Sequence, residues 1–290
     1  MIDWKHELEL SHLHDNGDYL HHEGLLEFSH TNTKVRYRKR DFLFSPGKWR
    51  GELVSPIVRR EGAGKLLIVG HSDMGTTPRD VAKIRLIGGY KSVLAANLTS
   101  GFWQSRLLGG RPLPLGLTNP TNESELHKVY GDASLLTRAF QTRRLPFNAG
   151  SLPHIYCNFS SATAPEHRLE LEGLVGGMRH IFRGRIDITK AGRLAYLSEI
   201  RNAGLVICPR GHGQDTHRLY ETLYLGAIPI VLKNSYQFRL CTTYGFPVVG
   251  LRNWGELANF DLITGMGAKA HFSPQGIENL RLSKWQSHLL

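Results

Sequence analysis

The segment spanning residues 205–232 contains residue types whose spacing suits anion binding at the start of a helix. It reads LVICPRGHGQDTHRLYETLYLGAIPIVL, with a short apolar run over 205–208, a glycine-containing loop, a helical pattern over 218–226 and a second apolar run over 227–232. In open α/β sheets, ligands bind beyond the carboxyl ends of the strands, where a loop leads into a helix. The spacing therefore predicts a strand, loop, helix and strand, with a ligand site in the loop.

The composition of this loop indicates a phosphorylated ligand. Gly211 and Gly213 allow backbone N–H groups to approach a phosphate, and the positive end of the helix dipole favours an anion. Either Asp215 or Thr216 is expected to cap the helix. The side chains that add positive charge or hydrogen-bond donors are Arg210, His212, His217 and Arg218.

Glu221 lies one turn into the same helix, where its carboxylate would repel a phosphate. Carboxylates accept hydrogen bonds from sugar hydroxyls, so a phosphate-binding loop followed by an acidic residue suggests a nucleotide, with Glu221 on the ribose. The alternative is structural. Arg218 and Glu221 are three residues apart and could form an ion pair on the helix surface, while the glycines only form the turn.

The length and the segment pattern predict two domains. A chain of 290 residues is longer than one hydrophobic core usually organises. Apolar runs over 65–70 and 92–98 predict strands, and the prolines and small residues of PFNAGSLP (146–153) favour a linker. Strands and helices alternate again after it, which is typical of a doubly wound parallel sheet. We therefore expect one domain over residues 1–150 and another over 151–290.

The bulk composition limits the partners and the compartment. A net charge of +11, from 36 Lys and Arg against 25 Asp and Glu, predicts attraction to polyanions, although a single basic cluster is usually a solvated face. No apolar run reaches the roughly 20 residues needed to cross a bilayer, and the N-terminus lacks the pattern of a signal peptide, so we expect cytoplasmic residence. We expect buried free thiols at Cys157, Cys208 and Cys241, and surface positions for the six histidines of residues 1–30.

The segment CPRGHGQDTHRLYETLYLGAIPIVL closely resembles the donor-binding signature of exostosin-like glycosyltransferases of the GT-B fold. PLGLTNPTNESELH (114–127) and IYCNFSSATAPEHR (155–168) look like further segments of related sequences, so the resemblance covers roughly the last two thirds of the chain. It implies an α/β fold with mostly parallel sheets, in which two Rossmann-like domains face a cleft. The N-terminal domain would lie on the acceptor side, and the C-terminal domain would bind a nucleotide sugar as co-substrate.

The resemblance also implies roles for residues of the donor loop. Arg210 would stabilise the departing diphosphate, Gly211 and Gly213 would admit the phosphates, and Glu221 would hold the ribose. The residues expected to shape the sugar-phosphate pocket are Asp215, Thr216, His217 and Arg218. The transferred sugar would be a hexose or a pentose, and no cofactor beyond the nucleotide sugar is expected.

A catalytic base is expected only if the enzyme inverts configuration. His71 and Asp73 are the candidates, because they follow the apolar run that ends at residue 70 and would lie at a strand's carboxyl end. Asp73 could instead cap the next segment, since HSD is also a plausible turn. No DxD motif stands at a strand end, so we expect no metal, with the leaving charge neutralised by arginine and the helix dipole.

Other polar residues of the matching segments could line the cleft, or could simply form loop and cap hydrogen bonds. These residues are Asn119, Asn158, Thr163 and Arg168. Trp103 could stack on a sugar or a base, although such a tryptophan is more often part of a core.

Three functions are compatible with these observations. The first is glycosyl transfer to a glycan, and the second is the same donor chemistry on a modified DNA base flipped into the cleft, which the charge of +11 favours. The third is a non-catalytic module that binds polyanions, because a fold alone does not guarantee catalysis. An intact loop with Arg210 and Glu221 favours an enzyme.

Overall fold

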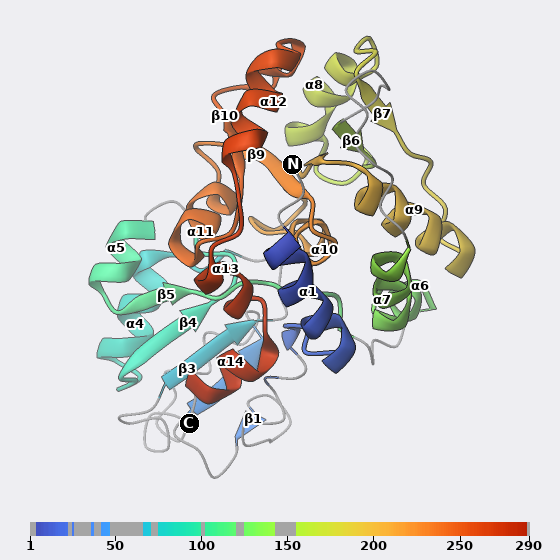
Figure 1. Cartoon of the computed structure of the whole chain (residues 1–290). Coiled ribbons are helices and arrows are strands. Elements are labelled where there is room, and N and C mark those ends of the chain that lie inside the picture. The colour runs from blue at the N-terminus through green and yellow to red at the C-terminus, as the bar shows by residue number, and fades with distance from the viewer. Residues whose placement is uncertain are drawn as a thin grey trace. The chain divides into compact units, whose positions relative to one another are not determined.

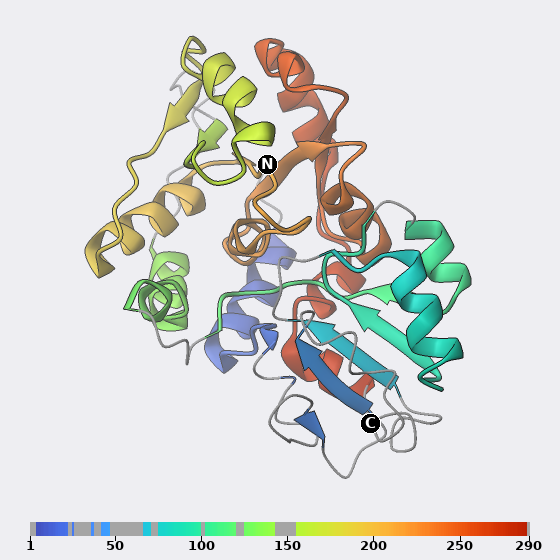
Figure 2. The ribbon, with the colours of Figure 1, turned by 180° about the vertical axis from the view of Figure 1, so that it is seen from behind.

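The computed structural model describes residues 4–22, 25, 36–37, 42–46, 66–70, 75–99, 102–119, 125–142 and 155–288. Its contacts divide the chain into two compact units. Unit 1 consists of Met1–Tyr19, Leu117–Gly211 and Thr216–Arg281, and unit 2 of Leu20–Gly116, His212–Asp215 and Leu282–Leu290. Both units are α/β, as predicted (Figures 1 and 2).

Unit 1 is built on a five-stranded parallel sheet in the order β10-β9-β8-β6-β7. The strands that compose it are β6 (Ile155–Cys157), β7 (Ile181–Arg183), β8 (Leu205–Ile207), β9 (Ile228–Leu232) and β10 (Val249–Leu251). This order is that of doubly wound folds in which the chain moves outward in opposite directions from the first strand. The reversal, called the switch point, lies between β6 and β8, where such folds bind ligands.

Helices connect these strands along the chain. The connecting and terminal elements are α8 (Pro165–Val175), α9 (Lys190–Asn202), α10 (His217–Tyr224), α11 (Tyr236–Tyr244), the 3-10 helix η3 (Trp254–Ala258), α12 (Phe260–Lys269) and α13 (Pro274–Glu278). Before the sheet come α1 (Trp4–Asn16), α6 (Glu125–Tyr130) and α7 (Ala133–Gln141). All three residues of β6 and of β8 are buried, so these strands are continuous apolar runs rather than alternating ones.

Unit 2 contains a second five-stranded sheet, in the order β1-β2-β3-β4-β5. Its strands are β1 (Arg36–Tyr37), β2 (Phe42–Pro46), β3 (Leu66–Gly70), β4 (Ser92–Ala95) and β5 (Gly110–Pro112). All neighbours pair in parallel except the short β1, which is antiparallel to β2. Its helices are α4 (Pro78–Leu86), α5 (Phe102–Leu107) and α14 (Leu282–His288). Both sheets are therefore mostly parallel, which confirms the predicted pair of Rossmann-like units.

The predicted elements of the C-terminal half match the structure closely. The strand predicted over 205–208 is β8, the helix predicted over 218–226 is α10, and Gly226 follows that helix with φ +73°. The expected linker at 146–153 lies outside the described residues. Helix α7 precedes that segment yet packs on α9, so it belongs to the same unit as the C-terminal sheet. The division at residue 150 stays a prediction.

The expectation of surface histidines near the N-terminus is wrong for two of them. His14 and His22 are 3% and 2% exposed. Nε2 of His14 donates to the Tyr224 carbonyl at 2.8 Å, and its Nδ1 accepts from the Tyr19 hydroxyl at 2.6 Å. The ring also stacks on Phe140, with 4.0 Å between the ring centroids. Within α1, His14 therefore faces the interior of unit 1, whereas His12 is exposed.

The expected state of the cysteines is confirmed, since Cys157, Cys208 and Cys241 are buried free thiols. In the described part of the chain, no helix is long and apolar enough to cross a membrane.

His14 predicts acid sensitivity of the fold. Burial lowers its pKa to about 4, against the smaller upward effect of its hydrogen bond to the Tyr224 carbonyl. Between about pH 6.5 and pH 4, the unfolded chain therefore binds a proton that the folded chain excludes, and stability is lost as the pH falls. We expect the free energy of unfolding to drop by roughly 2 kcal/mol from pH 7 to pH 5 through this group alone.

Urea unfolding at the two pH values tests this dependence. His14→Gln should remove that part of the pH dependence, whereas His12→Gln, at an exposed position of the same helix, should leave it unchanged. Equal pH dependence in the two variants would contradict the assignment.

Candidate functional site

The switch point of unit 1 brings together the segment after β6 and the loop after β8. Cys208 extends the pairing of β8, because its N–H donates to the Ile230 carbonyl at 2.9 Å. The Cys208 carbonyl then accepts from Nε2 of Gln237 at 3.2 Å. The backbone is therefore fixed on both sides of the point where the loop begins.

Arg168, from the second turn of α8, holds this loop. Its Nε donates to the Arg210 carbonyl at 2.8 Å and its Nη2 to the Pro209 carbonyl at 3.4 Å. Its Nη1 donates to the Ser160 carbonyl at 3.1 Å, in the segment after β6. One guanidinium thus ties together the two segments that flank the switch point.

Two more of the sequence-predicted residues lie beside this guanidinium. A Cβ atom on Gly211 would lie 3.5 Å from Nη2 of Arg168 and 3.9 Å from Cγ2 of Thr163, which are ordinary contact distances. The structure therefore brings together Thr163, Arg168, Arg210 and Gly211, which the sequence places in two separate segments. Glycine at 211 is not required by these neighbours.

The electrostatics of Arg168 favour an anion. The side chain is 6% exposed, its three hydrogen bonds go to backbone carbonyls, and no carboxylate of the described residues pairs with it. Burial and, to a smaller extent, the positive charge of Arg218 together lower its pKa to about 10. An anion close to both guanidinium groups would relieve this repulsion, so the site is poised for negative charge.

Helix α10 begins beside this loop. Thr216 is its N-cap residue and makes no side-chain cap hydrogen bond, so capping by Thr216 is not observed. Arg218, in the first turn, donates from Nε to the Tyr196 hydroxyl at 3.1 Å. Although burial disfavours its charge, the Tyr196 oxygen and the Glu221 carboxylate hold the pKa of Arg218 above its ordinary value. Arg218 is therefore fixed as a cation at the start of α10.

Glu221 is the acceptor at the end of this network. Its Oε1 accepts from Nη2 of Arg193 at 2.6 Å, and its Oε2 accepts from the Tyr196 hydroxyl at 2.7 Å. Burial would raise the pKa of Glu221, but the Arg193 guanidinium and these hydrogen bonds hold it below its usual range. Glu221 is 3% exposed. Its observed partners are the α9 side chains of Arg193 and Tyr196. A role on the ribose stays a prediction.

Arg193 and Tyr196 are site residues that the sequence reasoning missed. The basic stretch ending at Arg193 suggested a solvated face, yet Arg193 is 4% exposed and lies over the Tyr130 ring at 4.5 Å from its centroid. Its Nη1 is buried without a hydrogen-bond partner. The signal was its position four residues before Leu197, on the buried stripe of α9.

Residues 212–215 belong to unit 2, where Asp215 has a structural role. Its carboxylate accepts from the Leu115 N–H at 3.1 Å, and its own N–H donates to Oδ1 of Asn97 at 2.8 Å. Asn97 follows β4 and is itself strained, with φ +55°. Within the same unit, Gly213 is buried and His212 is exposed. The loop segment thus lies at the carboxyl edge of the second sheet.

The remaining candidate residues fall into three groups: one with an observed structural role, some whose roles are untested, and some outside the described residues. Nδ2 of Asn158 donates to the Arg185 carbonyl at 2.8 Å, which is the loop role considered as the alternative. Asn119 and His217 are half-buried, and their proposed roles stay predictions. His71 and Asp73 lie outside the described residues, as does the side chain of Trp103.

In the part of the chain that the structure describes, no group of three or more His, Cys, Asp or Glu side chains is arranged to hold a metal ion. The predicted independence from metal stays a prediction.

The fold of unit 1 is that of the doubly wound α/β proteins, and the cations gather at its switch point. Within this unit, residues 184–264 match the family model described as RXYLT1 C-terminal domain, a ribitol xylosyltransferase domain of the glycosyltransferase class. The match includes β8, the loop after it, α10 and the Arg193–Glu221 pair. This part of the chain is therefore similar to a glycosyltransferase domain. No curated protein matches the chain.

Glu221→Gln tests how much the buried ion pair of Arg193 and Glu221 contributes to the free energy of unfolding. The change leaves Arg193 buried without a counter-charge, so we expect a loss of roughly 3 kcal/mol and a Tm lower by about 6 to 10 °C. Glu278→Gln is the matched control, because Glu278 pairs with Arg281 at 3.0 Å at an exposed position. Such surface pairs contribute less than about 1 kcal/mol. Equal melting of both variants would rule out a stabilising role for the buried pair.

Proposed function

We propose that this chain is a glycosyltransferase that takes a sugar from a nucleotide-sugar donor, with the donor diphosphate at the switch point of unit 1. The observation that carries the proposal is Arg168, a buried guanidinium whose hydrogen bonds go to backbone carbonyls, which no carboxylate of the described residues neutralises and which has a second cation, Arg218, nearby. It supports an anionic ligand in the position where doubly wound folds bind nucleotides. The similarity of residues 184–264 to a glycosyltransferase domain supports the reaction class.

In this proposal, Arg168, Arg218 and Arg210 have different roles in binding the donor. Arg168 fixes the loop backbone and contributes charge, while Arg218 is oriented by Tyr196 at the start of α10. Arg210 is half-buried on the loop itself, and its side chain is the one we assign to the departing diphosphate. Donors that are already fixed in place stabilise developing negative charge without reorganisation, which lowers the barrier to departure of the nucleotide.

The finer assignments extend the same proposal. The resemblance to exostosin-like enzymes favours a glycan acceptor, a hexose or pentose donor and metal-independent transfer. His71 or Asp73 would act as the base only in an inverting reaction, in which the acceptor hydroxyl must lose its proton.

Donor binding is tested by thermal stability against UDP-, GDP-, ADP- and CMP-sugars, with EDTA and separately with Mg²⁺ or Mn²⁺. A donor at 100 times its Kd should add about 2.7 kcal/mol, which is a rise in Tm of roughly 5 to 10 °C. Arg210→Ala should remove most of this rise by deleting a charge-assisted contact, and should lower kcat by about 10²-fold or more.

Arg179→Ala is the control for the loss of one cation, because Arg179 is exposed on the surface of unit 1. It should keep the full shift. Absence of a shift with every nucleotide in a folded protein, or an unchanged shift in Arg210→Ala, would overturn the donor site and favour the polyanion-binding module.

The acceptor class is tested by salt. A neutral glycan acceptor should show a KM that changes less than about twofold between 50 and 200 mM salt, because no counterions are released. A DNA acceptor that contacts six or more phosphates should lose roughly 10³-fold in affinity over the same range. The net charge of +11 makes DNA the second candidate, and this measurement separates the two.

A further inference from the structure

Helices α4 and α5 form an exposed apolar surface on unit 2. The two helices lie side by side next to β3, β4 and β5 (Figures 1 and 2). Leu86 on α4 is 82% exposed and Leu107 on α5 is 87% exposed, the highest values among the large apolar residues of the described chain. Ile87 beside them is 44% exposed. These three residues define what we call the α4–α5 surface.

Hydrogen bonding places the two leucines at the same end of the helix pair. Nη1 of Arg85 donates to the Leu108 carbonyl at 2.6 Å, and these are the sequence neighbours of Leu86 and Leu107. Gly109 has φ +80°, and a Cβ there would lie 2.5 Å from the same Arg85 nitrogen. The turn that ends α5 is therefore packed tightly against the end of α4, and the leucines are held in place.

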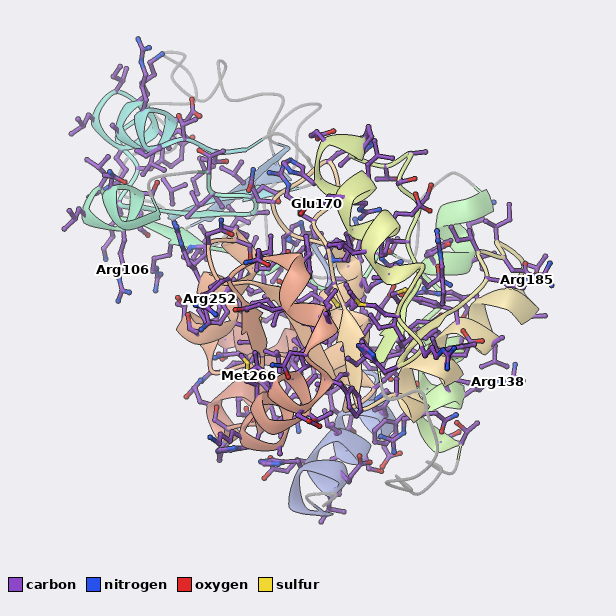
Figure 3. All side chains as sticks on the ribbon, turned by 90° about the horizontal axis from the view of Figure 1, so that it is seen from above. Arg106, Arg138, Glu170, Arg185, Arg252 and Met266 are labelled. Atoms are coloured by element: carbon purple, nitrogen blue, oxygen red, sulfur yellow. The ribbon has the colours of Figure 1, made fainter. Side chains whose placement is uncertain are left out.

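The described residues on and beside α4 and α5 carry mainly positive charge. Residues 75–99 and 102–119 contain a single carboxylate, Asp80, which accepts from Thr77 in the capping box of α4. The cations of the same stretches are Arg79, Lys83, Arg85, Lys91, Arg106 and Arg111. All of these except Arg85 are exposed, and Figure 3 shows Arg106 extending from α5 toward the outside of the ribbon.

We propose that the α4–α5 surface docks on an anionic lipid bilayer. Exposed lysine and arginine are attracted to the negative surface potential of such a membrane, and protruding aliphatic side chains bury themselves at the boundary of headgroups and acyl chains. A nucleic acid would also attract these cations, but single-stranded nucleic acids are bound through aromatic side chains on which the bases stack, whereas Leu86 and Leu107 are aliphatic. The combination of both features selects the lipid surface.

The orientation of the surface leaves the ligand edge of the same unit open. Helix α4 leads back to the start of β4, and α5 leads to the start of β5, so the ends of both helices lie at the amino edge of the sheet. The segment 212–215 lies at the carboxyl edge, near Asn97 and Leu115. Contact with a bilayer at the α4–α5 surface would therefore not cover that edge. The proposal does not depend on the transferase activity.

Sedimentation with vesicles of phosphatidylcholine containing about 30% phosphatidylserine, against pure phosphatidylcholine, tests the docking at about 0.15 M NaCl. The whole chain is strongly basic, so binding to anionic vesicles does not by itself show which surface binds. The decisive result is the effect of replacing the two leucines. Leu86→Ser combined with Leu107→Ser should weaken partitioning at least about tenfold. Arg79→Gln combined with Lys83→Gln, two exposed cations at helical spacing before Leu86 on α4, should weaken it about fivefold for each charge removed.

Two controls match these variants. Leu169→Ser changes a leucine of unit 1 that is 60% exposed, and Arg179→Gln removes an exposed cation of unit 1. Both should partition like the unmodified protein. The proposal is overturned if the double serine variant binds as tightly as Leu169→Ser, or if the unmodified chain does not bind anionic vesicles. The altered side chains are exposed, and far-ultraviolet circular dichroism checks that each variant is folded.

Discussion

The buried pair of Arg193 and Glu221 determines how the candidate site is arranged. A carboxylate that is 3% exposed is stable as an anion only next to a fixed cation, and Arg193 supplies this charge at 2.6 Å. The same carboxylate accepts from Tyr196, whose hydroxyl in turn accepts from Arg218. The direction of the Arg218 side chain is therefore set by a partner two hydrogen bonds away. Helix α10 cannot rotate without breaking this series of contacts.

A second buried arginine, Arg168, holds the loop, but no carboxylate of the described residues neutralises its charge. Arg193 is neutralised by a carboxylate, whereas Arg168 is held by the carbonyls of Ser160, Pro209 and Arg210. Carbonyls satisfy its N–H groups but leave its net charge uncompensated, which is costly in a buried position. Proteins keep such a charge where an anion can provide the missing compensation. The two arginines thus differ in how their charge is balanced, and this difference is the reason why the proposed anion site is assigned to Arg168 and not to Arg193.

The sequence was sufficient for features that depend on local order. Apolar runs, glycines and helix periodicity located β8, α10 and the switch-point loop within one or two residues, because these signals depend on neighbours in the chain. It was insufficient for partners brought together over long distances. Helical spacing before Leu197 could have placed Arg193 on the buried stripe of α9, but nothing local shows that its partner is Glu221, 28 residues further along the chain. Burial of His14 likewise depends on contacts with α7 and α10 far along the chain.

The same distinction limits what the net charge of +11 alone says about partners. Arg168, Arg193 and Arg201 all count toward it, yet each is at most 6% exposed, and the last two are paired with carboxylates. A partner interacts only with the charged side chains that are exposed. Where these side chains lie on the surface matters more than their total charge. On α4 and α5, the exposed cations Arg79, Lys83 and Arg106 share their helices with two leucines that are 82% and 87% exposed, a combination that composition cannot reveal. A polyanion would interact with the cations alone, whereas an anionic bilayer would interact with the cations and also bury the leucine side chains.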